Sequence, residues 1–284
     1  MLVRDLVRQH RSNLTAAERR IVPFLQDDSL VIELQSITKL ADAASVSTPT
    51  VIRLARKLGF DGFPDLQNAI RSELAERIKQ PLAKLEAQLP SAHQDHIVTS
   101  FAQRAVDNLN QTIGMLDFQM FDDVAKLLAQ SDRHLFLLGG RITRSSADHF
   151  FNHLQIIRPN VSLLSSSPSV WPQTVLDMDH ASVLIIFDIR RYQKELERLS
   201  ELAAGQGAEI ILFTDQWGSP IERFSGHCFR TTVEAPSSWD STIAINFLVE
   251  AMIAEVQKQL SDLSADRILE MERMIGETKL FGSS

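Results

Sequence analysis

Two patterns of hydrophobic positions divide the chain. Up to about residue 130, apolar side chains recur every three or four positions, which is typical of amphipathic helices. From residue 133 onward, short apolar runs alternate with helical segments. Such runs are typical of parallel strands that are covered by helices on both faces. The pattern therefore predicts an all-α N-terminal region followed by an α/β region.

The segment from Ser36 to Phe60 has the pattern of two short helices joined by a tight turn. Ser36 can cap the first helix and Ser47 the second, and Pro49 falls in the first turn of the second helix, where its missing N–H costs little. Apolar residues of the second helix stand at i, i+3, i+4 and i+7: Val51, Leu54, Ala55 and Leu58. This spacing predicts one buried face, and Gly59 is expected to end the helix.

Two further helices are expected upstream of this segment. Thr15 and Glu18 are spaced as a capping box at the start of the first, and Pro23 is expected to kink or shorten it. The second is expected from residue 28 or 29 to about residue 35. The N-terminal region is therefore predicted to be a small helical domain.

The outward face of the helix that starts near Ser47 carries hydroxyl groups at its start and cations further along. A helix-turn-helix protein places the start of its recognition helix in the major groove of DNA. We expect Arg53 to reach a base edge and Arg56 and Lys57 to contact phosphates. The predicted DNA-contacting residues are Ser47, Thr48, Thr50, Arg53, Arg56 and Lys57. A solvated basic face in an ordinary helical hairpin is the alternative.

Residues 14–70 resemble the N-terminal domain of RpiR-family regulators. The matching residues are Leu14-Thr15, Glu18-Arg19-Arg20-Ile21, Ile37, Leu40-Ala41, Val46-Ser47, Thr50-Val51, Arg53-Leu54, Arg56-Lys57-Leu58-Gly59-Phe60, Gly62-Phe63 and Leu66. Ser45 departs from the pattern, because the family usually has glycine in this turn. Serine can occupy the turn at a modest strain cost, so the resemblance still implies DNA binding.

The joint between the two regions is predicted from a break in the helical pattern. A helix is expected from Pro64 to about Gln80, and a polar stretch at residues 90–93 interrupts the pattern after it. We therefore predict a helix-turn-helix domain at residues 1–78, a linker at 79–95 and a ligand-sensing domain at 96–284.

Five apolar runs in the second region predict a parallel sheet. They cover residues 134–138, 161–164, 183–187, 209–213 and 227–231, with helical segments between the first four and helices near 238–260 and 264–276 after the last. We predict a three-layer α/β/α domain with a five-stranded parallel sheet.

Ligands bind such sheets at the carboxyl ends of the strands. The side chains expected there are hydroxyls and arginines beside a helix N-terminus, which together favour a small anion. They are Gly140, Arg141, Thr143, Arg144 and Ser145 after the first strand, Ser165 and Ser166 after the second, and Asp188, Arg190 and Arg191 after the third. A dinucleotide site is disfavoured, because the third glycine of G-x-G-x-x-G and the ribose-binding acid are missing.

Residues 133–255 resemble the sugar isomerase (SIS) domain that follows the helix-turn-helix in RpiR-type regulators. The resemblance implies a phosphosugar held by Ser/Thr-rich loops, with Thr143 at the hydroxyl position of the first loop. The second loop departs from the family's S-x-S-G-x-T, because the chain reads Asp188-Ile189-Arg190-Arg191-Tyr192-Gln193 there. Arg190 and Arg191 can hold a phosphate or carboxylate, or Asp188 can pair with one of them.

Charge and cysteine content bear on the partners and the cellular location of the protein. The net charge is −7, yet residues 1–80 carry 12 Lys and Arg against 10 Asp and Glu, a net +2 that leaves −9 for the rest. A slightly basic head on an acidic body fits local DNA contact. Cys228 is the only cysteine, and no apolar stretch approaches the ~20 residues needed to span a bilayer. We expect a cytoplasmic protein without membrane contact.

We predict a transcriptional repressor or activator and not an enzyme. Glu195, His227 and Glu234 are available as acids or bases, but no pattern pairs them for proton transfer. His149 and His153 lack the glutamate of the zinc-protease motif, so neither a metal nor another cofactor is expected. The expected partners are an operator in double-stranded DNA, a small anionic metabolite and further copies of the chain in a homodimer or homotetramer. A sugar-phosphate isomerase and an interaction module that does not bind DNA are the alternatives.

Overall fold

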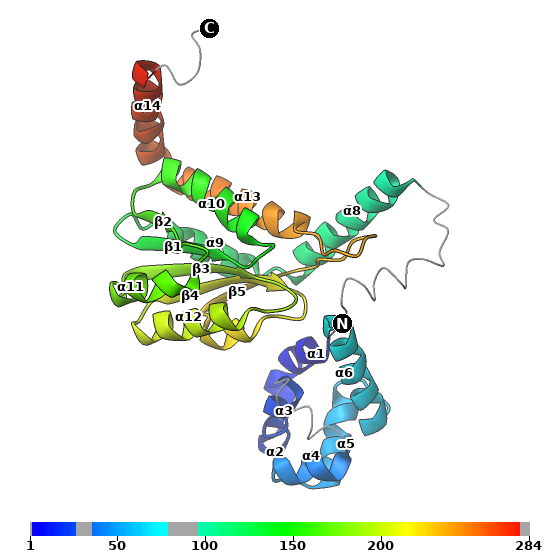
Figure 1. Cartoon of the computed structure of the whole chain (residues 1–284). Helices are drawn as coiled ribbons and strands as arrows, with labels where there is room; N and C mark the ends of the chain where they lie inside the picture. The colour runs from blue at the N-terminus through cyan, green and yellow to red at the C-terminus, as the bar shows by residue number, and fades with distance from the viewer. Residues whose placement is uncertain (1, 27–35, 79–95, 279–284) are drawn as a thin grey trace. The chain divides into compact units, whose positions relative to one another are not determined.

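The computed structural model describes residues 2–26, 36–78 and 96–278 (Figure 1). The chain divides into two compact units, Met1–Lys79 and Gln80–Ser284. The expected helix near residues 28–35 and the expected linker at 79–95 lie outside the described residues.

The N-terminal unit is helical throughout its described residues. Its helices are α1 (Val3–Gln9), α2 (Ala16–Arg19), α3 (Val22–Gln26), α4 (Ile37–Ala43), α5 (Thr48–Lys57) and α6 (Phe63–Ile78). The predicted capping box is confirmed, since the Glu18 N–H donates to Thr15 Oγ1 and the Thr15 N–H donates to Glu18 Oε2. The helix that follows is split in two, and Pro23 lies in the first turn of α3, where its ring meets no preceding turn.

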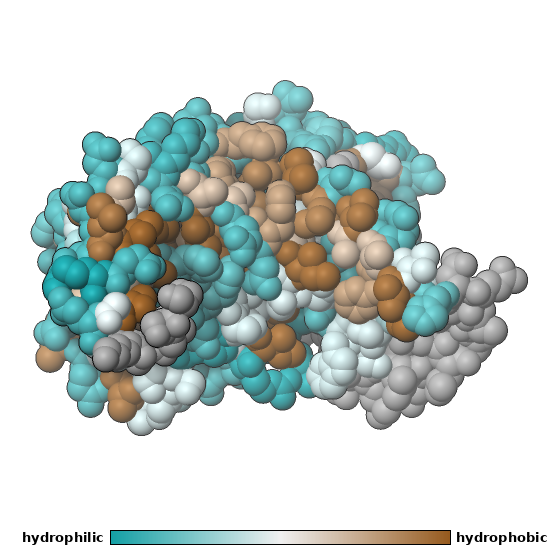
Figure 2. All heavy atoms as spheres, turned by 90° about the horizontal axis from the view of Figure 1, so that it is seen from above, coloured by the Kyte–Doolittle hydropathy of each residue, from teal (hydrophilic) through white to brown (hydrophobic). Residues whose placement is uncertain are grey.

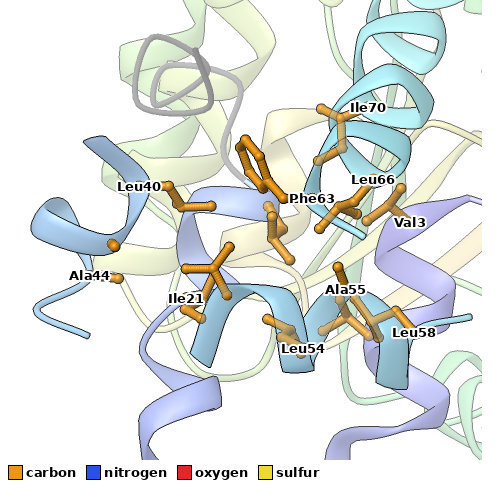
Figure 3. Packing of buried hydrophobic residues seen from close by; sticks show 14 of the residues in the cluster. Val3, Ile21, Leu40, Ala44, Leu54, Ala55, Leu58, Phe63, Leu66 and Ile70 are labelled. Atoms are coloured by element: carbon orange, nitrogen blue, oxygen red, sulfur yellow. The ribbon is translucent and has the colours of Figure 1, made fainter. Parts of the chain in front are cut away.

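The apolar face of α5 is buried, as predicted, and belongs to the core of this unit. Figure 3 shows Leu54, Ala55 and Leu58 close to side chains from the surrounding helices. The partners that the core cluster brings together include Val3, Ile21, Leu40, Phe63, Leu66 and Ile70. Leu54 and Ile21 are fully buried, so the packing of α5 fixes which of its sides faces water.

The turn between α4 and α5 uses a left-handed residue. Ser45 has φ 51°, and the N–H groups of Ser45 and Val46 donate to the carbonyls of Asp42 and Ala41. This pair of bonds is the Schellman motif, in which glycine is the usual residue at the left-handed position. A side chain in this conformation costs ~1–2 kcal/mol, which is the strain expected of serine here.

The C-terminal unit is built on a five-stranded parallel sheet, as predicted. The strands are β1 (His134–Gly139), β2 (Val161–Leu163), β3 (Ser182–Asp188), β4 (Glu209–Asp215) and β5 (His227–Thr231). Their order is β2-β1-β3-β4-β5, and every neighbouring pair is parallel. The chain leaves β1 toward β2 on one side and later returns to place β3 on the other, so the direction of winding reverses between β1 and β3.

Helices cover both faces of the sheet (Figure 1). The helices of this unit are α8 (Ile97–Met115), α9 (Phe118–Leu128), α10 (Arg144–Ile157), α11 (Trp171–Leu176), α12 (Lys194–Gly205), α13 (Ile243–Gln259) and α14 (Ser261–Thr278). On one face Leu138, Ile186 and Leu212 join the core cluster that contains Leu196 of α12. On the other, Phe150 of α10 packs edge-on against Phe187 and Phe213.

On the side of the sheet that α10 and α13 cover, some apolar side chains of the helices remain exposed. Phe247 of α13 is 36% exposed, and Val106 and Ile113 of α8 are 50% and 39% exposed. Figure 2 looks onto this side of the molecule and shows apolar surface across it. No helix in the described parts of the chain combines the length and hydrophobicity needed to cross a membrane.

The helix expected from residue 238 begins later, at Ile243. Residues 237–239 form a local turn, in which the Ser237 hydroxyl donates to the Trp239 carbonyl and accepts from the Trp239 N–H. Asp240 then pairs with Arg190 at the end of β3. These contacts hold the segment in an extended loop, so the helix starts only after it.

A single arginine holds together three parts of the C-terminal unit. Arg158 follows α10 and has none of its surface exposed. Its guanidinium donates to the carbonyl of Leu128 at the end of α9, to that of Arg133 before β1, and to that of Pro159. Burial lowers the pKa of Arg158 to about 10. The side chain therefore serves as the hydrogen-bond partner of carbonyls that helix ends and loops leave open.

Candidate functional site

The solvent-facing side of α5 carries the first candidate site. Arg53 and Arg56 are exposed, as are Ser47 and Pro49 at the start of the helix, and Thr48 is half-buried. The guanidinium of Arg56 donates weakly, at 3.4 Å, to the carbonyl of Asp61. The two arginines thus leave one helix on the side opposite its core, as the sequence predicts.

Thr50 was expected on the same outward face, and this expectation is wrong. Only 5% of Thr50 is exposed, because it stands one helical turn before the buried Leu54. Its Oγ1 lies 2.9 Å from Ser47 Oγ and accepts a hydrogen bond from Arg53 Nη2 at 3.0 Å. Ser47 occupies the N-cap position of α5 without making a side-chain cap. The hydroxyls at the start of α5 therefore bond to one another and to Arg53.

Lys57 was expected to contact phosphates, but its ammonium is already engaged within the unit. Lys57 Nζ lies 2.6 Å from Glu18 Oε2 and donates to the Asn13 carbonyl at 3.0 Å. Burial would raise the pKa of Glu18, but hydrogen bonds from Lys57 and Thr15 outweigh it and lower the pKa below its ordinary value. The pair fastens α2 to the end of α5. Lys57 is therefore a structural cation.

The second candidate site lies where β1 ends and α10 begins. Gly139 leaves no room for a side chain, since a Cβ there would overlap the Thr143 carbonyl oxygen. Thr143 precedes α10, is buried, and donates its hydroxyl to the Phe187 carbonyl of β3 at 2.6 Å. The Gly140 N–H donates to the same carbonyl at 2.9 Å. Because the Thr143 hydroxyl is used in this way, α10 begins without a side-chain cap.

The remaining predicted residues on this side of the edge differ in exposure. Arg141 and Ser145 are exposed beside the start of α10, and Ser165 and Ser166 are exposed after β2. Arg144 instead donates to Asp148 Oδ1 at 2.8 Å and to the Leu164 carbonyl at 2.6 Å. Arg144 therefore ties α10 to the end of β2.

The loop after β3 is held by hydrogen bonds to residues at the end of β4 and in the segment that follows it. Asp188 is buried, and its carboxylate accepts from Ser219 Oγ at 2.6 Å and from the Gln193 N–H at 3.4 Å. Burial raises the pKa of Asp188 to about 7, although the two hydrogen bonds oppose the rise. Of the two alternatives considered for this loop, the pairing of Asp188 with Arg190 or Arg191 is not the one observed, since Ser219 and Gln193 are the partners of Asp188.

Arg190 was expected to face a ligand, but its side chain is only 5% exposed. The guanidinium stacks on the Trp217 ring, with Cζ 3.8 Å from the ring centre, and its Nε lies 3.5 Å from Asp240 Oδ1. Arg191 is exposed and has φ 63°, a left-handed conformation that is uncommon for a residue with a side chain. Of the two arginines, the structure presents only Arg191 to solvent.

Asp215 at the end of β4 organises this loop, and the sequence did not single out its role. Its carboxylate accepts from the Arg190 N–H and from the Tyr192 hydroxyl, each at 2.7 Å, and from the N–H groups of Trp217 and Gly218. Burial raises the pKa of Asp215. The one available signal was local: an aspartate followed by a turn commonly accepts from N–H groups two and three residues later.

The described residues include no group of three His, Cys, Asp or Glu that could hold a metal ion. His149 Nε2 instead lies 2.6 Å from Glu250 Oε1 of α13, and the His149 and His153 rings meet edge-on.

A helical unit in which α5 carries exposed arginines, followed by a parallel α/β unit, is the architecture of a two-domain helix-turn-helix regulator. Comparison with known proteins agrees. Residues 1–77 match the helix-turn-helix domain of the rpiR family, and residues 127–255 match the SIS domain. The chain belongs to the rpiR family of helix-turn-helix transcriptional regulators that carry a SIS domain.

Relatives of known name support this assignment. HexR of Pseudomonas aeruginosa, a helix-turn-helix transcriptional regulator, is 26% identical over 230 residues, or 79% of this chain and 76% of HexR. YfhH of Escherichia coli, described as an uncharacterised regulator of this type, is 20% identical over 95% of this chain and 96% of its own. Among solved structures, Vibrio vulnificus NanR covers 99% of this chain and 100% of its own at TM-score 0.57 and 16% identity. The sugar isomerase domain of an RpiR transcription factor from Sphaerobacter thermophilus covers 63% of this chain and 99% of its own at TM-score 0.60 and 17% identity.

Proposed function

We propose that the SIS domain binds a small anionic metabolite, such as a phosphorylated sugar, at the junction of β1 and α10. Binding there alters how the N-terminal unit engages its operator. The observation that carries this proposal is the start of α10, which has no side-chain cap and lies between β1 and β3, where the winding of the sheet reverses. In open parallel sheets, ligands bind outside the carboxyl ends of the strands at this reversal.

The physical basis is the field at the start of α10. N–H groups of a first helical turn, together with the helix dipole, favour a negative charge. The Thr143 hydroxyl points to Phe187 and so does not fill this position, while Arg141 and Ser145 are exposed beside it. A Cβ at Gly140 would lie 3.0 Å from Gln193 Oε1, so glycine suits this tight position, and Ser165 and Ser166 add exposed hydroxyls after β2.

A solved relative gives independent support for this ligand class. The Vibrio vulnificus NanR structure, which matches this chain over nearly its whole length, is described as a complex with ManNAc-6P. In this chain the loop after β3 is not proposed as the phosphate cradle, because Asp188 and Arg190 are held by internal partners. The start of α10 and the serines after β2 are therefore the groups proposed to receive the anion.

We further propose that α5 reads DNA through Ser47, Thr48, Arg53 and Arg56. Residues 1–78 then form the DNA-binding domain, residues 79–95 the linker and residues 96–284 the sensor. The chain acts as a homodimer or homotetramer on a pseudo-palindrome with half-sites about 34 Å apart or a multiple of that distance. Exposed apolar side chains on α8 and α13 supply surface for assembly.

A pair of substitutions at one position tests the ligand site. Ser145→Glu places a fixed negative charge at the start of α10, where a helix tolerates it well, and so competes with a bound anion. Ser145→Gln has nearly the same shape without the charge. We expect sugar phosphates to raise the thermal stability of the wild type and of Ser145→Gln, and Ser145→Glu to lose about tenfold in affinity. Equal affinity in the two variants, or a response to unphosphorylated sugars alone, refutes the site.

The DNA assignment is tested on the full chain with duplexes selected from fragmented genomic DNA of the source organism. Arg53→Ala should weaken binding to the selected site by about 1–3 kcal/mol while leaving non-specific binding nearly unchanged. Arg56→Ala should weaken binding to all sequences and lower the salt slope by about one. Wild-type affinity in Arg53→Ala refutes the base contact. Coupling between two binding sites is reciprocal. The factor by which saturating operator changes the affinity for the sugar phosphate must therefore equal the factor by which the sugar phosphate changes the affinity for the operator.

A further inference from the structure

Three polar side chains form a hydrogen-bonded chain along the first turns of α5. Ser47 Oγ lies 2.9 Å from Thr50 Oγ1, and Arg53 Nη2 lies 3.0 Å from the same oxygen. A guanidinium can only donate, so Thr50 Oγ1 is the acceptor in the contact with Arg53. The three residues are spaced at i, i+3 and i+6, so the chain runs along one side of the helix toward its N-terminus.

The acceptor in this chain is held by the core of the unit. Thr50 is 5% exposed; it directly precedes Val51 and lies one helical turn before Leu54, and both of these residues are fully buried. A β-branched side chain in a helix also has few χ1 rotamers, and packing removes the remainder. Thr50 Oγ1 therefore has a fixed position relative to the helix axis.

Arg53, by contrast, is exposed and would otherwise sample many rotamers. Ordering a free arginine on DNA costs side-chain entropy. A hydrogen bond from Nη2 to a fixed oxygen reduces that cost in advance, and it leaves the other N–H groups of the guanidinium available to a base.

We propose that Thr50 is a positioning residue that sets the sequence specificity of Arg53. It does not touch DNA itself; it holds the Arg53 guanidinium toward the start of α5, the part of a recognition helix that meets base edges. The role rests on the proposed base contact of Arg53. It predicts that loss of the Thr50 hydroxyl lowers discrimination between sequences and leaves general attraction to DNA in place, since the charge of Arg53 remains.

The test compares Thr50→Val with Thr50→Ser in the full chain. Valine keeps the buried volume and removes the acceptor, whereas serine keeps the acceptor. The probes are the operator selected by the wild type from random-sequence duplexes, a set of this operator with one base pair changed at a time, and an unrelated duplex. One operator variant in this set is changed at the base pair that Arg53 contacts. For Thr50→Val, we expect the ratio of the affinity for the operator to the affinity for this variant to fall about tenfold. Affinity for the unrelated duplex and its salt slope should stay unchanged, and Thr50→Ser should behave as the wild type.

Unchanged discrimination in Thr50→Val overturns the positioning role. Arg53→Ala shows which claim has failed: if it loses discrimination while Thr50→Val keeps it, the base contact stands and only the positioning role is wrong. If both keep it, the base contact of Arg53 is wrong and the positioning role falls with it.

Thermal melting checks that each variant is folded. If Thr50→Val does not fold, Thr50→Cys replaces it, because cysteine keeps most of the volume and is only a weak acceptor. A loss of affinity for all duplexes in the folded variant also overturns the proposal.

Discussion

Replacing Arg158 with methionine tests the interpretation that this buried arginine holds the C-terminal unit together. Methionine fills similar space but cannot donate a hydrogen bond. The substitution removes the hydrogen bonds that the Arg158 guanidinium donates to the carbonyls of Leu128 and Arg133. A buried carbonyl without a partner costs about 1–3 kcal/mol, so two such groups give a loss of ~2–6 kcal/mol.

An opposing contribution reduces this loss. Burial of the guanidinium is itself unfavourable, as the lowered pKa of about 10 indicates, and methionine removes that charge from the interior. We therefore expect Arg158→Met to lower the free energy of unfolding by about 2–4 kcal/mol, a large part of the total for a typical domain.

The chain provides both the assay and a matched control. Its three tryptophans, Trp171, Trp217 and Trp239, all lie in the C-terminal unit, so tryptophan fluorescence in urea follows the unfolding of that unit. Arg267 also donates to two backbone carbonyls, those of Gln155 and Ile156, but from a partly exposed position where water can replace it. Arg267→Met should cost below about 1 kcal/mol. Equal losses in the two variants would falsify the interpretation.

Two further predictions concern pH and the turn before α5. The pKa of Asp188 is raised to about 7 in the folded chain, so between pH 4 and 7 the folded state binds more protons than the unfolded state. The free energy of unfolding of the C-terminal unit should therefore fall by about 2–4 kcal/mol as the pH rises through this range. Urea unfolding across pH should show this slope in the wild type and a flatter one in Asp188→Asn; an identical slope in both contradicts the assignment. Ser45→Gly should stabilise the N-terminal unit by about 0.5–1 kcal/mol by relieving the left-handed strain, measured by hydrogen exchange of amides in α4 and α5. Ser47→Gly, at an ordinary φ of −83°, should give no gain, and equal protection in both variants would argue against strain at Ser45.

The sequence predicts well whatever depends on neighbours along the chain. The capping box at Thr15, the buried stripe of α5 and the five strands follow from local spacing, and the structure confirms them. The partners of charged groups could not be predicted in the same way. Lys57 has the periodicity of an outward residue, yet its partner Glu18 lies 39 residues earlier. Only the folded arrangement of α2 against α5 brings the two charges together.

The loop after β3 illustrates the same limit. Its arginines and aspartate have the composition of an anion site, and the partners of Asp188 and Arg190 come from the segments that follow β4 and β5. Ser219 reaches Asp188, and Asp240 reaches Arg190. The need to pair these charges also displaces the start of α13, which local propensity placed five residues too early. A pattern along the chain indicates which groups need partners, and the topology of the sheet decides which partners they receive.

The pairing of Arg190 with Asp240 constrains how this chain can evolve. Both side chains are largely buried, so replacing either one alone removes the ion-pair partner of a buried charge at a cost of ~2–4 kcal/mol, whereas replacing both together costs less. A lineage that exchanges this loop for a hydroxyl-rich one must therefore cross an unstable intermediate or change both positions at once. The two positions are therefore expected to change together, and related proteins that keep the arginine at 190 are expected to keep an acid at 240.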